Sequence, residues 1–322
     1  MFDVAVSQLT TLQWDLSQEL PAVAEHGLAA ISLWRPKLSD GGLEAVTAAV
    51  AASGVRVSSL QWAGGFTGSD GRTFAESVAD AAEAISMAAV LGGGARSGFV
   101  ARPPVVVVHS GCRAGHTRSH AVRLLVEALD MLVPLARAEG VVLALRPMHS
   151  LASAGCSFLT RLDESLELVE RIADPHVRLA VDLWQFADAP DFDALAPRLA
   201  AAAALVHVAD RVGPPVACAD RLLPGRGELP LEACVSQMVD CGYDGDLEFD
   251  PVGEAVQELG YAAAFAEIRA VADTWIDRMA EAMPARLRRV DPPHHQLRDV
   301  QRRGAGAGSR RSQASTQVVS RG

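Results

Sequence analysis

The chain repeats one pattern eight times: a short run of β-branched and aliphatic residues, a polar loop, and an amphipathic stretch rich in alanine. The predicted strands are Asp3–Ser7, Ala30–Leu33, Arg56–Gln61, Val105–His109, Val141–Leu145, Arg178–Asp182, Leu205–Ala209 and Asp246–Phe249. The predicted helices are Leu16–His26, Gly42–Ala52, Thr73–Leu91, Arg118–Ala138, Leu162–Ile172, Phe192–Ala203, Leu231–Cys241 and Val256–Met283. Several strands are continuous apolar runs, which is typical of parallel strands buried on both faces. Eight such units predict an α/β protein with a closed (β/α)₈ barrel.

A chain of 322 residues is long enough for this TIM-barrel fold, for which roughly 250 residues are typical. The alternative is an open doubly wound sheet, which normally carries a glycine-rich phosphate loop after its first strand. The first predicted strand ends at Ser7 and no glycine follows it, whereas the glycines at positions 92–94 follow a helix. Glycines in that position commonly end helices. We therefore expect one TIM-barrel domain over residues 1–284.

The net charge of −10 conceals a basic C-terminal tail on an acidic body. From Ala285 onward nine arginines face two aspartates, whereas acidic residues outnumber basic ones in the rest of the chain. The acidic body argues against a nucleic-acid-binding groove. Residues 285–322 are rich in Gly, Ser, Gln and Arg, so we expect a flexible, Arg-rich tail after a short helical extension. For this tail, a role at nucleic acids or membranes and a plain solvated extension both stay open.

The sequence contains neither a predicted membrane span nor a predicted secretory signal. No apolar run reaches the roughly 18 residues that crossing a bilayer requires, and the start of the chain lacks a basic segment followed by an apolar one. The five cysteines are odd in number and lack zinc-ribbon spacing, which favours free thiols in a reducing compartment. We therefore expect a cytoplasmic protein with no membrane partner.

Polar side chains stand at the C-terminal ends of five successive predicted strands, where TIM barrels carry their chemistry. These residues are His109, Arg146, Asp182, His207 and Glu248. Each by itself has a structural interpretation, because a histidine there is often simply hydrogen-bonded and an aspartate often caps the next helix. Their occurrence at equivalent ends of neighbouring strands instead predicts a functional pocket.

Seven further residues on the same face are candidates for substrate binding: Trp34, Arg35, Trp62, His149, Gln185, Arg221 and Arg226. The tryptophans are suited to stack on a sugar ring, but ordinary packing at the barrel mouth explains them equally well. The arginines are suited to bind a phosphate, but surface salt bridges explain them too. Asp210, which follows the seventh strand, is a candidate to orient the His207 imidazole.

The most specific pattern lies in the last third of the chain. It comprises His207, a Pro-Gly-x-Gly turn at positions 224–227, an apolar helix, a Gly-Tyr-x-Gly turn at positions 242–245, and Glu248. This pattern resembles the seventh-to-eighth βα segment of xylose isomerase-like TIM barrels, the sugar phosphate isomerase/epimerase superfamily. Further matches are Ile31–Leu38, Val55–Thr67, Leu143–His149 and Val181–Phe186, so the resemblance covers nearly all of residues 1–280.

The resemblance implies one divalent cation (Mn, Zn, Mg or Co) held by Glu, Asp, His and Glu on strands five to eight. By position these ligands are Arg146, Asp182, His207 and Glu248, so an arginine replaces the first glutamate. A guanidinium does not bind a cation or act as a base near neutral pH. We therefore expect Arg146 to take the place of the metal and to pair with Asp182 and Glu248. On this hypothesis, Arg146→Glu creates or strengthens a divalent site.

Three functions follow from this resemblance and this departure. The first is a metal-free isomerase, epimerase or lyase that moves a proton on a small sugar, keto-polyol or hydroxy-acid. Arg146 then serves as an electrostatic clamp, with Glu248, His207 or His109 as acid and base. The second is a metal-dependent isomerase or lyase whose cation is held by Asp182, His207 and Glu248. The third is a non-catalytic ligand-binding or accessory barrel. The expected partner is a small-molecule substrate and, by family analogy, a second copy of the chain.

Overall fold

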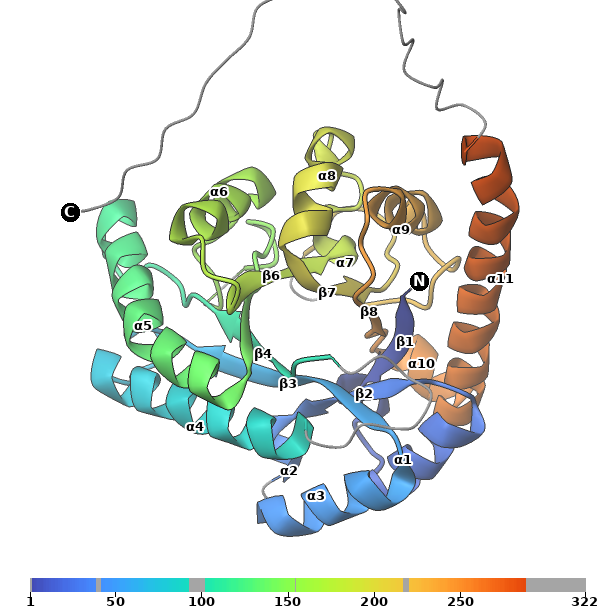
Figure 1. Ribbon diagram of the computed structural model, residues 1–322, viewed down its shortest axis with the longest axis horizontal. Helices are drawn as coiled ribbons and strands as arrows, with labels where there is room; N and C mark the ends of the chain where they lie inside the picture. Colours follow the sequence, from blue (N-terminus) through green and yellow to red (C-terminus); the bar gives the residue numbers. More distant parts are fainter. Residues whose placement is uncertain (1, 39–41, 93–101, 154, 217–219, 288–322) are drawn as a thin grey trace, which may run out of the picture. The chain divides into compact units, whose positions relative to one another are not determined.

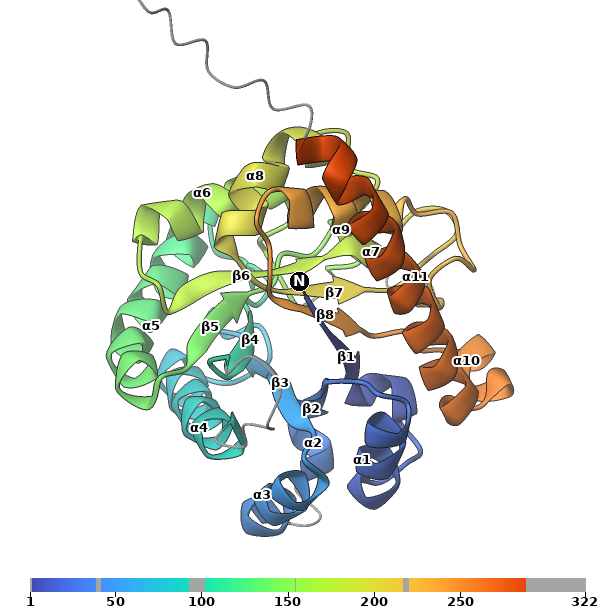
Figure 2. The same ribbon diagram turned by 45° about the vertical axis from the view of Figure 1, so that its right-hand side comes forward.

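In the computed structural model, which describes residues 2–38, 42–92, 102–153, 155–216 and 220–287, eight parallel strands close into a barrel in chain order. The strands are β1 (Asp3–Ser7), β2 (Ala30–Trp34), β3 (Arg56–Gly64), β4 (Val105–His109), β5 (Val142–Leu145), β6 (Val177–Asp182), β7 (Ala203–Val208) and β8 (Asp246–Phe249). β1 pairs with both β2 and β8, which completes the closure. Figures 1 and 2 show the strands at the centre with the helices around them. The predicted (β/α)₈ TIM barrel is therefore confirmed.

The helices lie on the outer face of the barrel. They are η1 (Gln8–Thr11), α1 (Leu16–Glu25), α2 (Arg35–Leu38), α3 (Gly42–Ser53), α4 (Phe74–Gly92), α5 (Arg118–Glu139), α6 (Leu162–Ile172), α7 (Leu183–Phe186), α8 (Phe192–Ala202), α9 (Leu231–Asp240), α10 (Glu254–Leu259) and α11 (Tyr261–Leu287). The prediction of one helix over Val256–Met283 is wrong, because α10 ends at Leu259 and α11 begins at Tyr261, with Gly260 between them. The φ of +86° at this glycine is incompatible with a continuing right-handed helix.

Local signals in the sequence explain where the longer helices begin and end. Asp15 caps α1 by accepting hydrogen bonds from the backbone N–H groups of Ser17 and Gln18, and the Gln18 side chain in turn accepts from the Asp15 N–H. Thr117 caps α5 in the same way, and Gly140 ends that helix with a φ of +67°. These caps satisfy backbone groups that a helix cannot pair internally.

Side-chain alternation along the strands separates the interior of the barrel from its outer face. Residues two apart in a strand point to the same side, so the row Val105, Val107, His109 faces the interior, and so does the row Val142, Ala144, Arg146. A buried apolar layer fills the lower interior: Val105, Val107, Val142, Ala144, Ala180 and Leu205. The large core between sheet and helices takes the alternate residues, such as Val106 and Val108. The polar strand ends therefore stand next to a buried apolar layer in the barrel interior.

The structure also bears on the expectations about membrane spans, cysteines and the C-terminal tail. No helix in the described ranges is both long and apolar enough to cross a membrane. The four described cysteines, Cys112, Cys156, Cys234 and Cys241, are all free thiols. Residues 1–280 form one compact unit. The predicted tail begins at position 285, but α11 continues to Leu287; the remainder of the predicted flexible tail, residues 288–322, lies outside the described part of the chain.

Candidate functional site

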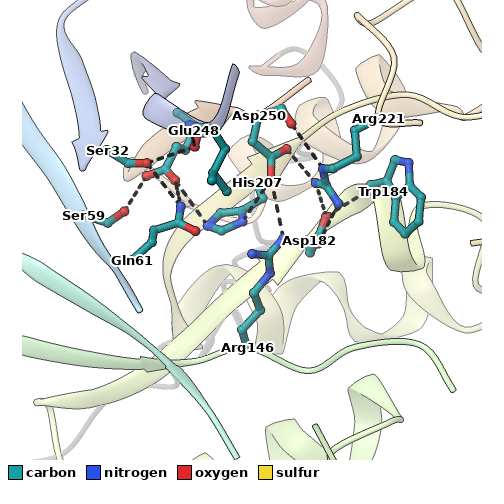
Figure 3. Close-up of polar contacts among 12 residues, drawn as sticks. Ser32, Ser59, Gln61, Arg146, Asp182, Trp184, His207, Arg221, Glu248 and Asp250 are labelled. Carbon is teal, nitrogen blue, oxygen red and sulfur yellow. Dashed lines mark hydrogen bonds and ion pairs between the residues drawn. The ribbon is translucent and has the colours of Figure 1, made fainter. Parts of the chain in front are cut away.

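The five polar side chains predicted at the strand ends converge inside the C-terminal end of the barrel. His109, Arg146, Asp182, His207 and Glu248 are all buried, and none exposes more than 7% of its surface. The register explains this, because Asp182 pairs with His207 and His207 pairs with Glu248 across neighbouring strands. Figure 3 shows how four of them, Arg146, Asp182, His207 and Glu248, lie relative to one another.

Two arginines hold the Asp182 carboxylate from two sides. Arg146 donates from Nη2 to Asp182 Oδ2 at 2.7 Å, and Arg221 donates from Nη2 to Oδ1 at 3.0 Å and from Nη1 to Oδ2 at 3.3 Å. The backbone N–H of Trp184 adds a further hydrogen bond to Oδ1 at 3.1 Å. Burial alone would raise the pKa of Asp182, but the positive charges of Arg221 and Arg146 outweigh it and hold that pKa well below its usual range.

Asp250 completes this ion cluster, which contains Arg146, Asp182, Arg221 and Asp250. Arg221 Nη2 lies 2.6 Å from Asp250 Oδ1, and Arg146 Nη2 lies 3.5 Å from Asp250 Oδ2. The Arg221 guanidinium also stacks over the Trp184 ring at 4.9 Å from the centroid. Burial opposes ionisation of Asp250, yet the charge of Arg221 keeps its pKa low. The cluster therefore contains two guanidinium cations and two carboxylate anions, hydrogen-bonded in a buried position.

Glu248 lies apart from both arginines, which overturns the expected Arg146–Glu248 pair. Its carboxylate accepts hydrogen bonds from Ser59 Oγ at 2.8 Å, Ser58 Oγ at 3.0 Å and Gln61 Nε2 at 2.5 Å. These three donors all come from β3, and no hydrogen bond or ion pair joins Glu248 to Arg146 among the described residues. His207 stands between the two groups (Figure 3), with Nε2 3.5 Å from Glu248 Oε1 and Nδ1 3.5 Å from Asp250 Oδ2.

The arrangement does not fit the divalent cation that the resemblance implies. Metal ligands must offer free lone pairs, but both oxygens of Asp182 face guanidinium donors and both oxygens of Glu248 accept hydrogen bonds from neighbouring side chains. Two cations already lie next to Asp182, and a third would be repelled. Within the described ranges, no group of three or more His, Cys, Asp or Glu side chains is arranged to hold a metal ion.

A pocket of about 730 Å³ lies over the ends of β2, β3 and β4, and none of the four residues of the ion cluster is in its described lining. Its lining includes Trp34, Arg35, Trp62 and His109, all four predicted as site residues. The Trp62 ring stacks on the His109 ring, with centroids 5.0 Å apart and planes 8° from parallel. His109 therefore connects the pocket to the buried strand ends.

The His109 imidazole is held neutral. Burial, with the nearby charge of Arg146, lowers its pKa to about 3. Its Nε2 atom is buried and has no hydrogen-bond partner among the described residues. A neutral imidazole with one open nitrogen is suited to form a hydrogen bond with an oxygen of a bound ligand.

The remaining predicted site residues do not line this pocket. The Gln185 side chain accepts a hydrogen bond from the backbone N–H of His149 at 3.0 Å, and Arg221 belongs to the ion cluster. Arg226 forms an exposed pair with Glu267. Asp210 does not orient His207; it accepts hydrogen bonds from the N–H groups of residues 211, 225 and 229 and so shapes the Pro-Gly-x-Gly turn.

The sequence did not indicate the charged wall of the pocket. Asp80 on α4 forms a two-pronged pair with Arg35 at 2.9 and 3.0 Å, and Arg72 adds a contact of 2.9 Å to the same carboxylate. Asp70 in turn pairs with Arg72 at 2.6 Å. Asp80 sits in a regular amphipathic helix far from any strand end, so its sequence context carried no signal of a site.

Comparison with known proteins places the chain in a family. The xylose isomerase-like TIM barrel family matches residues 20–282, so the chain belongs to this family. No curated protein matches the chain.

Solved structures with the same fold include protein SMc04130 from Sinorhizobium meliloti, with a TM-score of 0.73 and 22% identity over 83% of this chain and 96% of that one. The IolI protein with a bound zinc atom has a TM-score of 0.71 and 18% identity over 86% and 99% of the two chains. An L-ribulose 3-epimerase has a TM-score of 0.68 and 17% identity over 91% and 99%. At these identities the likeness concerns the fold.

Proposed function

We propose that the protein is a sugar isomerase or epimerase that works without a resident metal ion. The proposal rests on one observation above all: the Arg146 guanidinium, 2.7 Å from Asp182, occupies the position where the resemblance predicts a metal ligand. Solved structures with a similar fold include an L-ribulose 3-epimerase and a D-psicose 3-epimerase, and this likeness supports a keto-sugar or related polyol as the substrate.

The reaction class requires a proton to leave a carbon beside a carbonyl group and to return to the neighbouring carbon or to the opposite face. The negative charge of the enediolate formed between these steps needs stabilisation. A metal would normally supply it; here the fixed charge of Arg146 takes that role. His109 lines the pocket, and the free lone pair of its neutral imidazole accepts the proton that leaves the substrate carbon. The imidazolium returns this proton to the neighbouring carbon in an isomerisation, whereas in an epimerisation water supplies a proton to the opposite face and takes up the one on His109.

The test follows exchange of carbon-bound hydrogen in D₂O, because enolisation gives exchange whichever product forms. The full chain, purified without added metal, is incubated with D-fructose, D-psicose and L-ribulose, and proton NMR records the signal beside the carbonyl before and after treatment with EDTA. We expect exchange that EDTA does not change. Exchange that stops with EDTA and returns with Mn²⁺ would refute the metal-free proposal.

Variants separate the role of Arg146 from its contribution to folding. Arg146→Met should abolish exchange, and Arg146→Lys, which keeps a positive charge, should retain part of it. The control is Arg198→Met on α8, because Arg198 forms an exposed pair with Glu170 away from the pocket. Full exchange in folded Arg146→Met would overturn the assigned role.

A second candidate function, ligand binding without catalysis, is favoured by the state of Glu248. This expected proton carrier is fully buried, and Ser58, Ser59 and Gln61 hold both of its oxygens. A carboxylate so engaged does not reach a substrate in the pocket. Calorimetric binding of a sugar without hydrogen exchange in the same sugar would select this second function over the first.

A further inference from the structure

We propose that the pocket selects an unphosphorylated sugar or polyol that carries an apolar ring, in preference to a free monosaccharide or a sugar phosphate. This inference rests on the proposed function, because it names the substrate class of the same site. Three properties of the pocket carry it: its volume, its apolar wall and the pairing of its charges.

The volume exceeds what one sugar ring needs. The pocket measures about 730 Å³, which lies within the range of roughly 300–1,000 Å³ that accommodates drug-sized ligands. One water molecule takes up about 30 Å³ of liquid, so the pocket corresponds to about two dozen waters. A single monosaccharide would leave much of this space filled with water.

Part of the pocket wall is apolar. Leu38 at the end of α2, Leu43 at the start of α3 and Met87 on α4 face the pocket together with two tryptophans. Trp34 and Trp62 lie 6.5 Å apart, tilted by 40°, and Trp62 exposes 38% of its surface. Large apolar side chains grouped in a concave site are typical of ligand recognition. A sugar ring can stack on one tryptophan, but an aromatic or alicyclic substituent would cover more of these apolar side chains than the hydroxyl groups of a bare sugar can.

The charged side chains of the pocket argue against a phosphate. The two arginines among the described lining residues, Arg35 and Arg72, are both paired with Asp80, and Arg72 is also paired with Asp70. Burial opposes ionisation of Asp80, but hydrogen bonds from Arg35 and Arg72 keep its pKa low, so the pair stays charged. With Glu83 added, the described lining contains three carboxylates and two guanidinium groups. A phosphate dianion would meet net negative charge.

Isothermal titration calorimetry of the full chain with three probes tests the inference. The probes are phenyl β-D-glucopyranoside, methyl β-D-glucopyranoside and glucose 6-phosphate. We expect the phenyl glucoside to bind roughly tenfold or more tightly than the methyl glucoside, because its ring stacks and buries apolar surface. Glucose 6-phosphate should bind more weakly than either. A phenyl glucoside that binds no better than the methyl glucoside, or does not bind, overturns the inference, and so does a tighter glucose 6-phosphate.

A matched pair of variants locates the effect. Leu43→Ser, in the first turn of α3, should weaken binding of the phenyl glucoside more than binding of the methyl glucoside and so lose most of the preference between them. Leu16→Ser is the control, because Leu16 is also half-buried in the first turn of a helix and does not line the pocket. An unchanged preference in Leu43→Ser would contradict the inference. The outcome is separate from that of the proposed function: phenyl preference without hydrogen exchange in any sugar would support the pocket inference and count against catalysis.

Discussion

Replacing Arg146 with methionine tests whether this arginine neutralises a buried carboxylate. The side chain of Arg146 exposes 7% of its surface and that of Asp182 exposes none, and the two charges meet at 2.7 Å. Removing one partner of a buried ion pair typically costs about 3–5 kcal/mol, because the other charge remains buried. Arg221 still donates to both oxygens of Asp182, so we expect the lower end, a loss of about 3 kcal/mol in the free energy of unfolding.

Urea unfolding at pH 7 measures this loss, with the midpoint and the slope determined separately. Arg198→Met is the control, because its ion pair with Glu170 is exposed on both sides and such pairs contribute less than about 1 kcal/mol. NMR titration adds an independent readout, since removal of the Arg146 charge should raise the pKa of His109. A loss no larger than that of the control, with the His109 pKa unchanged, would refute the assigned ion cluster.

The remaining predictions concern three positions near the site. Because the folded state keeps His109 neutral to about pH 3 whereas the unfolded chain binds the proton below about pH 6.5, stability should fall as pH falls; between pH 7 and pH 4 it should fall by about 3 kcal/mol more than in His109→Gln. Gly64→Ala should lower the free energy of unfolding by roughly 3 kcal/mol or more, because the new Cβ would lie 1.9 Å from the His109 carbonyl oxygen. Gly71→Ala, at a position that also has a positive φ but open space around it, should lower it by about 1 kcal/mol. Equal losses of stability for the two variants in urea unfolding would contradict this reasoning. The sequence alone predicts that Arg146→Glu creates a divalent site, but the structure changes this expectation: the single variant should not gain Mn²⁺ affinity by calorimetry, because Arg221 still donates to both oxygens of Asp182. Tight Mn²⁺ binding by Arg146→Glu would contradict this reasoning.

The fold could be predicted because its signals are local and repeated. Apolar runs such as Val105–Val108 report strands buried on both faces, and each is followed by a helix with a 3.6-residue pattern. The ends of elements are less certain, because their limits depend on pairing with neighbours: β3 continues three residues past the predicted end at Gln61, where β4 supplies partners. The break at Gly260 was missed because one glycine within a long helical pattern is compatible with a continuous helix.

The location of the candidate site could also be predicted, but not the partners within it. The two-residue period of a strand fixes that His109 and Arg146 point inward. The arginine side chain is long and flexible, so more than one carboxylate lies within its reach. Which of them it pairs with depends on distances that the sequence does not give. Arg146 bonds to Asp182 instead of Glu248, because three donors on β3 have already engaged Glu248. Ser58 and Ser59 gave no sign of this role, since serines in a strand are common.

The role of Arg221 follows from the charge balance of the whole cluster. A divalent cation would bring two positive charges to the acidic strand ends, and Arg146 alone brings one. Arg221, which reaches the cluster from the loop after β7, brings the second, so Asp182 and Asp250 are matched by two guanidinium groups. Both carboxylates can therefore stay ionised in a buried place, as the direction of their pKa shifts requires. The sequence shows that an arginine stands at the end of β5 where the resemblance expects a glutamate. Only the folded structure shows that the loop after β7 brings a second arginine, Arg221, to the same group of carboxylates. On the proposed metal-free function, the pair of arginines, not Arg146 alone, supplies the charge that the resemblance assigns to a divalent cation.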